Sequence, residues 1–139
     1  MKSKNLIKYS VCFVVLFVVL LSSCAGTANS TATVEHAREW LTGLEETKVT
    51  INSKEYTVEL SDDFLALLKL EQWENKTGSR SQKVVATIYL YEQCEIYLHG
   101  NGTASIYYGY APRNERAYNL FAIPSDVAEA ITDYVVNND

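Results

Sequence analysis

Residues Val84–Tyr110 read VVATIYLYEQCEIYLHGNGTASIYYGY, and this stretch decides the fold. It is rich in β-branched and aromatic residues, which favour strands, and short polar segments interrupt it at intervals typical of turns. Together with the segment that follows, it predicts four consecutive strands joined by short turns, a β-meander. We expect these strands at about Val84–Tyr91, Glu95–His99, Thr103–Tyr110 and Ala117–Ile123.

The turn between the second and third strands sets their register. A two-residue Asn-Gly turn would bring Leu98 to the same face as polar residues of the next strand. A three-residue turn with Gly102 in the left-handed conformation instead pairs Leu98 with Ala104, and Ile96 with Ile106. Because a slip of one residue moves every side chain to the other face, we expect the three-residue turn.

The same argument, applied to the first two strands, predicts that Leu90 faces Ile96 and that Ile88 faces Leu98, with a turn at Glu92-Gln93-Cys94. The resulting sheet has two different faces. The predicted core face carries Ala86, Ile88, Leu90, Ile96, Leu98, Ala104, Ile106 and Tyr108. The other face carries Thr87, Tyr89, Tyr91, Tyr97, His99, Ser105 and Tyr107. We expect helices to cover the first face.

The segments on the N-terminal side of the meander predict two helices and a hairpin. Apolar spacing predicts a helix over Val34–Leu44, capped by Thr33, and a second helix that begins after Ser61. Apolar and polar residues alternate in Lys48–Leu60, which predicts a hairpin, whereas the polar segment Glu74–Gln82 predicts a loop.

A helix that begins at Pro124-Ser125-Asp126 completes the predicted elements. The sequence therefore predicts an α+β fold: an antiparallel β-meander of about four to six strands, with helices packed on one face and a C-terminal helix. The region that follows the N-terminal segment is long enough for one core, so we expect a single domain over residues 34–139.

The N-terminal residues have the pattern of an export signal. Lys2, Lys4 and Lys8 precede an apolar run, Val11–Leu21, and no acidic residue occurs before Glu35. A positive segment followed by an apolar one is typical of secretory signals. The run is shorter than the roughly 20 residues that span a bilayer, so a permanent transmembrane helix is the weaker interpretation.

The apolar run ends in Leu21-Ser22-Ser23-Cys24, a large apolar residue followed by two small ones and a cysteine. This tetrapeptide resembles the lipobox of bacterial lipoproteins; a chance cysteine in an ordinary secretory signal is the alternative. The resemblance implies diacylglycerol on Cys24 and cleavage between Ser23 and Cys24. Residues 1–23 are then a signal peptide, and residues 24–33 a lipidated cysteine with a flexible tether. The lipid would hold the body at the cell membrane, on the extracytoplasmic side.

The charge balance argues against nucleic acid as a partner. The chain has 12 Lys and Arg against 17 Asp and Glu, a net charge of −5, and loss of the signal makes it more acidic. Phosphate binding is driven by clustered basic residues, so a body this acidic is a poor candidate for it. The cysteines exclude an internal disulfide, because Cys12 leaves with the signal and Cys24 carries lipid, so that the body keeps Cys94 alone.

Few residues of the body suit catalysis or metal binding. The chain has two histidines, His36 and His99, whereas a zinc site needs three or four ligands. We expect both histidines at the surface, and no metal or cofactor. Cys94 with His99 is the one conceivable thiol dyad, but an offset of five residues along a strand places them on opposite faces. We therefore expect a non-enzymatic protein with a structural, partly buried Cys94.

The second face of the predicted sheet is the leading candidate for a binding site. Tyr89, Tyr91, Tyr97 and Tyr107 lie on it, near His99. Tyrosine combines a flat apolar ring with a hydroxyl group, which suits binding of proteins or glycans. Cross-strand aromatic pairs also stabilise sheets, so these residues have a purely structural interpretation as well. A third possibility is that the first helix and its tryptophan cover this face.

The leading hypothesis is a non-enzymatic protein- or glycan-binding module of the cell envelope. Two alternatives stay open. The first is an accessory or inhibitor lipoprotein that acts through the loops Glu74–Gln82 and Tyr110–Arg116, the second of which carries Arg113. The other is a small envelope enzyme with a polar cleft around His99 or Cys94.

Overall fold

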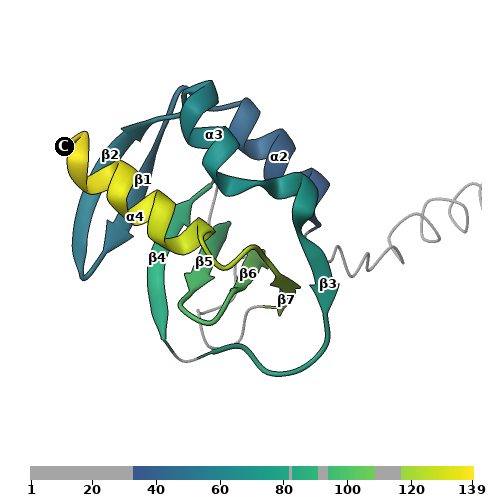
Figure 1. Ribbon diagram of the computed structural model, residues 1–139. Helices are drawn as coiled ribbons and strands as arrows, with labels where there is room; N and C mark the ends of the chain where they lie inside the picture. The colour runs from purple at the N-terminus through teal and green to yellow at the C-terminus, as the bar shows by residue number, and fades with distance from the viewer. Residues whose placement is uncertain (1–32, 82, 91–93, 109–116) are drawn as a thin grey trace, which may run out of the picture. The chain divides into compact units, whose positions relative to one another are not determined.

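A seven-stranded antiparallel sheet with helices on one face forms the described part of the chain, as the computed structural model in Figure 1 shows. The structure describes residues 33–81, 83–90, 94–108 and 117–139. Cys24 and its flanking residues, Tyr91 and the segment Tyr110–Arg116 lie outside this range. The predicted α+β class, with a C-terminal helix packed on the sheet, is confirmed.

The strands follow the order β2-β1-β4-β5-β6-β7-β3 across the sheet. The predicted meander forms the centre, where four strands pair in chain order: β4 (Val84–Tyr89), β5 (Glu95–His99), β6 (Thr103–Tyr108) and β7 (Ala117–Ala122). The predicted hairpin of β1 (Glu46–Ile51) and β2 (Lys54–Glu59) extends one side, and β3 (Glu74–Lys76) extends the other. Within the described residues, β2 and β3 are therefore the two edges of the sheet.

The register predicted for β5 and β6 is confirmed. Leu98 pairs with Ala104, and Ile96 pairs with Ile106. Gly102 has a φ of 70°, the left-handed conformation that the three-residue turn requires.

The register predicted for β4 and β5 is wrong by two residues. Ile88 pairs with Ile96 rather than with Leu98, and the Leu90 amide donates to the Cys94 carbonyl over 2.8 Å. A shift of two residues leaves every side chain on its predicted face, so hydrophobic alternation does not distinguish the two pairings. Residues 91–93, which join these strands, lie outside the described range.

Local signals place the helices. α2 (Val34–Thr42) begins where the Thr33 hydroxyl accepts from the His36 amide, and α3 (Asp62–Leu68) begins where the Ser61 hydroxyl accepts from the Phe64 amide. A short 3₁₀ turn, η1 (Leu70–Gln72), follows α3. α4 (Val127–Asn137) starts without a side-chain cap, because the Asp126 carboxylate pairs instead with Lys69, 2.5 Å away. This ion pair connects the end of α3 to the start of α4.

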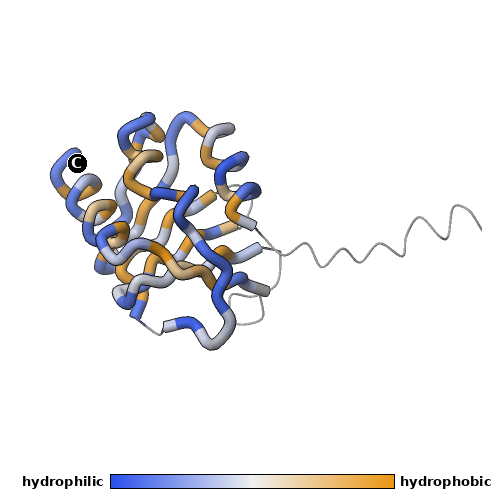
Figure 2. Tube along the Cα trace, turned by 45° about the vertical axis from the view of Figure 1, so that its right-hand side comes forward, coloured by the Kyte–Doolittle hydropathy of each residue, from blue (hydrophilic) through white to orange (hydrophobic). Residues whose placement is uncertain are grey.

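The core lies between the helices and the predicted apolar face of the sheet. All three α-helices are on this side of the sheet in Figure 1, and hydrophobic positions recur along their length in Figure 2. The fully buried side chains of the core come from both layers: Leu41, Phe64, Leu68 and Ile131 from helices, and Val49, Ile88, Ile96, Leu98 and Ile106 from strands.

Two predictions about the margins of the sheet are wrong. Tyr108, expected in the core, is 42% exposed, because it is the last residue of β6 and its ring stacks on Trp40 of α2, which is itself only half-buried. The predicted loop Glu74–Gln82 begins with strand β3, an additional strand paired with β7. β3 has three residues, all of them polar and exposed. Its sequence therefore lacks the apolar alternation by which strands are predicted. Trp73 anchors it by donating from Nε1 to the Leu68 carbonyl over 2.7 Å.

Candidate functional site

The face of the sheet opposite the helices carries a row of side chains that runs across four strands. The strand registers place Tyr89 opposite Glu95, Glu95 opposite Tyr107, and Tyr107 opposite Tyr118. Tyr97 joins this row from the next position on its own face of β5, with its ring centre 4.7 Å from that of Tyr107. The Tyr107 and Tyr118 rings are stacked at 5.4 Å. We call Tyr97, Tyr107 and Tyr118 the tyrosine cluster.

Most of the described residues of this face are buried, a point that the sequence left open. Tyr97 is 3% exposed, Tyr107 is 1% exposed and His99 is fully buried. Tyr89 is half-buried. Alternation along a strand tells which side chains share a face, but it does not tell whether another segment covers that face.

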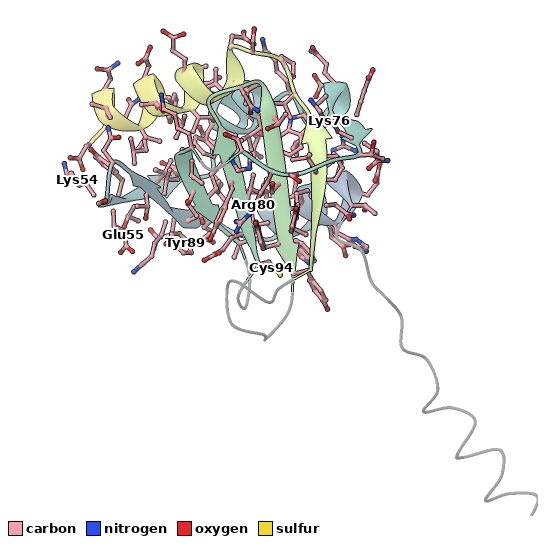
Figure 3. All side chains as sticks on the ribbon, turned by 90° about the horizontal axis from the view of Figure 1, so that it is seen from below. Lys54, Glu55, Lys76, Arg80, Tyr89 and Cys94 are labelled. Carbon is pink, nitrogen blue, oxygen red and sulfur yellow. The ribbon has the colours of Figure 1, made fainter. Side chains whose placement is uncertain are left out.

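Arg80, from the segment that follows β3, is part of this cover. Its guanidinium carbon lies 5.3 Å from the centre of the Tyr107 ring and 5.7 Å from that of Tyr118. Figure 3 shows Arg80 over the middle of this face, with Lys76 beside one edge of the sheet and Lys54 beside the other. Both arginine distances are within the range of cation–π attraction.

Two hydrogen bonds join polar groups beneath the cluster. The Tyr97 hydroxyl donates to Glu95 Oε2 over 2.7 Å, and the carboxylate itself is 7% exposed. His99 Nε2 and Ser105 Oγ are 2.9 Å apart, and both side chains are fully buried. Buried polar groups that are hydrogen-bonded in this way fix the side chains of one face in a single arrangement.

His99 is fully buried, so its predicted surface position is wrong. Burial lowers the pKa of the imidazole below its ordinary value of 6.5; the backbone of Lys83 opposes this shift, and the positive charge of Arg80 adds to it. A serine hydroxyl within hydrogen-bond distance of an imidazole has the spacing of a nucleophile and its base. Ser105 is fully buried, however, so its hydroxyl is not open to a substrate.

Cys94 and His36 are the other two residues that the sequence analysis considered for catalysis or metal binding. Cys94 is buried, with 5% of its surface exposed, and the imidazole of His99 contacts Ser105. His36 is exposed, as predicted, and its ring stacks on Trp40 at 5.6 Å. Trp40 in turn stacks on Tyr108, so α2 and its tryptophan do not cover the tyrosine cluster.

The accessible part of the site is its rim. Tyr118 is 37% exposed and Arg80 is half-buried, so both present part of their surface to solvent beside the buried Tyr107. The segment from Asn75 to Leu90 contains Lys76, Arg80 and Lys83 but no acidic residue. A positive strip therefore accompanies the tyrosine cluster in an otherwise acidic chain.

Sequence reasoning missed both rim residues. Tyr118 was within a predicted strand, but its neighbours depend on the β6–β7 register, which the residues between these strands leave open. Arg80 was within a predicted loop, and loop positions carry no periodic signal. The available signal was compositional: three cations and no acid over sixteen residues, next to a tyrosine-rich face.

The described residues contain no group of three or more His, Cys, Asp or Glu side chains that is placed to hold a metal ion. They also contain no helix that is long and apolar enough to cross a membrane. Comparison of the chain with protein-family models, with curated proteins and with solved structures gives no match.

Proposed function

We propose that this protein is a membrane-anchored extracytoplasmic lipoprotein whose body is a non-enzymatic binding module. The observation that carries the proposal is the rim formed by Arg80 and Tyr118 over the tyrosine cluster. Arginine and tyrosine are enriched among the residues that dominate binding energy at interfaces. The buried part of the cluster supports this use, because it holds the rim in one conformation before a partner arrives and so lowers the entropy lost on binding.

The chemistry of the rim suits an envelope protein or a glycan. A tyrosine ring offers a flat apolar surface with a hydroxyl at its end, and the guanidinium offers hydrogen-bond donors to carboxylate or hydroxyl groups. Lys76 and Lys83 are exposed on the same segment as Arg80 and add positive charge. We therefore expect a partner whose surface is acidic or rich in hydroxyl groups, and no nucleic acid.

Site-specific photo-crosslinking in the native host tests the rim. A benzophenone amino acid at position 118 is expected to form a covalent adduct with a discrete envelope component. The same amino acid at position 136 is the matched control, because Val136 is 49% exposed on α4, among the helices that cover the other face of the sheet. Arg80→Gln should reduce the adduct at position 118 by about fivefold or more, as expected for the loss of one binding hot spot. Equal adducts from both positions, or an adduct insensitive to Arg80→Gln, contradict the proposal.

The anchor rests on Leu21-Ser22-Ser23-Cys24 and is tested separately. Growth of the host with an alkyne fatty acid should label the protein, and Cys24→Ser should abolish the label and release the body from the membrane fraction. Cys12→Ser is the control, because that residue is in the expected signal peptide, and it should keep the label. An unlabelled wild-type protein, or one whose leader is uncut by mass spectrometry, contradicts the anchor.

A further inference from the structure

The outer edge of β2 exposes a row of unpaired backbone groups. The Leu60 amide donates to the Glu45 carbonyl over 2.9 Å, and these two residues continue the β1–β2 register. In an antiparallel pair, hydrogen-bonded and non-hydrogen-bonded residue pairs alternate. The residues of β2 that point their backbone groups toward β1 are therefore Lys54, Tyr56 and Val58. Glu55, Thr57 and Glu59 point theirs away from the sheet.

These outward groups are accessible. Glu55, Thr57 and Glu59 are all exposed, and no strand of the described chain pairs with this side of β2. β2 is the outermost strand beside the C-terminal end of α4 in Figure 1. Such an edge is a template for one more strand. The other edge, β3, has three residues and offers a much shorter row.

A cavity lies alongside this edge. It has a volume of about 250 Å³ and lies between β2 and the last turns of α4. Its lining includes Tyr56 and Val58 from β2 and Tyr134, Asn138 and Asp139 from the α4 end. Tyr56 and Val58 are on the helix side of the sheet, so alternate side chains of an added strand would lie over this cavity.

The uncompensated charges along the β2 edge are negative, which favours a basic partner. Lys48 pairs with Glu55 at 2.7 Å, and Lys54 pairs with Asp139 at 2.7 Å, so both cations are already compensated. Glu46 and Glu59 face each other across β1 and β2, and neither has an ion-pair partner among the described residues. Like charges directly opposite each other are unfavourable in a sheet, and a cation on an added strand would relieve this pair.

The same charges disfavour a second copy of this chain. Two β2 strands paired antiparallel about Thr57 would place Glu55 of each copy opposite Glu59 of the other. That arrangement adds two like-charge pairs, as in the charged edges that keep natural sheets from joining.

We propose that the β2 edge binds an extended, lysine- or arginine-bearing polypeptide segment as an additional antiparallel strand. Backbone groups of Glu55, Thr57 and Glu59 hydrogen-bond to the segment. Basic side chains of the segment lie beside Glu59 and Glu46, and its alternate side chains lie over the cavity next to α4. This surface is separate from the Arg80–Tyr118 rim, so a negative result for one proposal does not contradict the other.

The test uses the full protein in detergent and a fluorescent heptapeptide of alternating lysine and valine. We expect saturable binding of the peptide by anisotropy. The peptide should slow hydrogen exchange in the β2 segment more than in the other strands. Two methylated peptides distinguish strand pairing from charge attraction. N-methylation of the lysine amides, which face β2 when lysine lies opposite Glu59, should abolish binding, whereas N-methylation of the valine amides should leave it intact. A peptide with glutamate in place of lysine should not bind.

Two substitutions at one position complete the test. Thr57→Pro removes the outward N–H without breaking a bond to β1 and should weaken binding by about fivefold or more. Thr57→Val keeps the N–H and should bind as the wild type does, and thermal melting checks that each variant is folded. Equal binding of the two methylated peptides, binding of the glutamate peptide, or a protein that dimerises through β2 and excludes the peptide would overturn the proposal. If Thr57→Pro does not fold, the methylated peptides decide alone.

Discussion

Gly102 shows how a single residue fixes a register. Its φ of 70° is accessible to glycine at no cost, and a Cβ there would meet the Ile123 carbonyl oxygen at an ordinary 3.5 Å. Any other residue at position 102 would therefore be destabilising because of its left-handed backbone conformation and not because of a steric clash. This position, like the caps Thr33 and Ser61, was predictable because its conformation depends on a few neighbouring residues.

Gly102→Ala should lower the free energy of unfolding by about 1 kcal/mol, the cost of an L-residue in the left-handed region. Gly43→Ala is the matched control. Gly43 has a φ of −85° and room for a Cβ, 3.5 Å from the Glu39 carbonyl oxygen. That substitution should raise the free energy of unfolding by about 0.5 kcal/mol, because alanine restricts the unfolded chain. Urea titration of both variants gives the two values, and equal signs would contradict the assignment.

His99 makes stability depend on pH in a defined direction. Because the folded state lowers the pKa of this imidazole below 6.5, the unfolded chain takes up the proton first as the pH falls. Stability from this residue is therefore complete above pH 6.5 and decreases as the pH falls through the window just below it. Urea titrations at pH 7.5 and 5.5 should show this loss in the wild type and a smaller loss in His99→Gln. A ring pKa at or above 6.5 by NMR would contradict the buried, neutral state.

The burial of His99 and Tyr97 was not predictable from the strand that carries them. Their alternation placed them together on one face, and this was correct. Whether that face meets water depends on contacts such as that between Arg80 and the Tyr107 ring, which join residues 27 positions apart in the sequence. Strand periodicity contains no information about such a contact.

At the scale of elements, the β1–β2 hairpin is stable despite a turn that does not suit its residues. Asn52 and Ser53 have φ angles of 50° and 66°, so both central residues are left-handed. A turn of this kind matches the twist of the strands, and its preferred sequence is Asn-Gly. Serine at the second position is therefore strained.

Ser53→Gly should raise the free energy of unfolding by about 1 kcal/mol, since it removes the left-handed strain at that position. The turn precedes β2, whose outer edge is the proposed peptide-binding site. Because Ser53 is not among the residues proposed to hydrogen-bond to the peptide, the variant should bind the lysine–valine peptide as the wild type does. Thermal melting measures the first effect. A destabilised variant would show that Ser53 makes a compensating contact.

Elements with apolar periodicity were predictable, and those without it were not. The helices and the central strands were expected near their observed bounds, because each buries one side against the core. β3 was missed, because a three-residue polar strand at the margin takes its structure from pairing with β7. The β4–β5 register was misjudged because two alternatives two residues apart bury the same side chains.

At the scale of the whole molecule, stability rests on burial on both faces of one sheet. Helices cover the apolar face, and the second face buries tyrosine, histidine and serine in a hydrogen-bonded layer. Residues beyond Cys24 include one further cysteine, Cys94, which is 5% exposed. Packing and hydrogen bonds hold the described residues together, and the proposed lipid on Cys24 would occupy that thiol.

The midpoint of thermal unfolding should consequently be the same with and without a reducing agent. Differential scanning calorimetry of the protein in detergent, with and without a phosphine reductant, makes the comparison. A lower midpoint in the reduced sample would reveal a disulfide between chains.

The class of the fold followed from the sequence because patterns in each segment agreed on it. The proposed rim did not follow from the sequence, because it combines Arg80 from the segment after β3 with Tyr118 from β7. The sequence placed Tyr97 and Tyr107 on one face, whereas the burial of that face and the contacts of Arg80 with the Tyr107 and Tyr118 rings depend on the tertiary arrangement.

The position of α2 has a mechanical consequence. The chain enters the described body at Thr33, directly before this helix. The hydrogen bonds of a helix run along its axis, so tension at its first residue loads them one after another, whereas those of a sheet are loaded side by side. If the protein has the proposed anchor and binds a partner, a pull between the two would therefore unwind α2 before it separates the strands of the sheet.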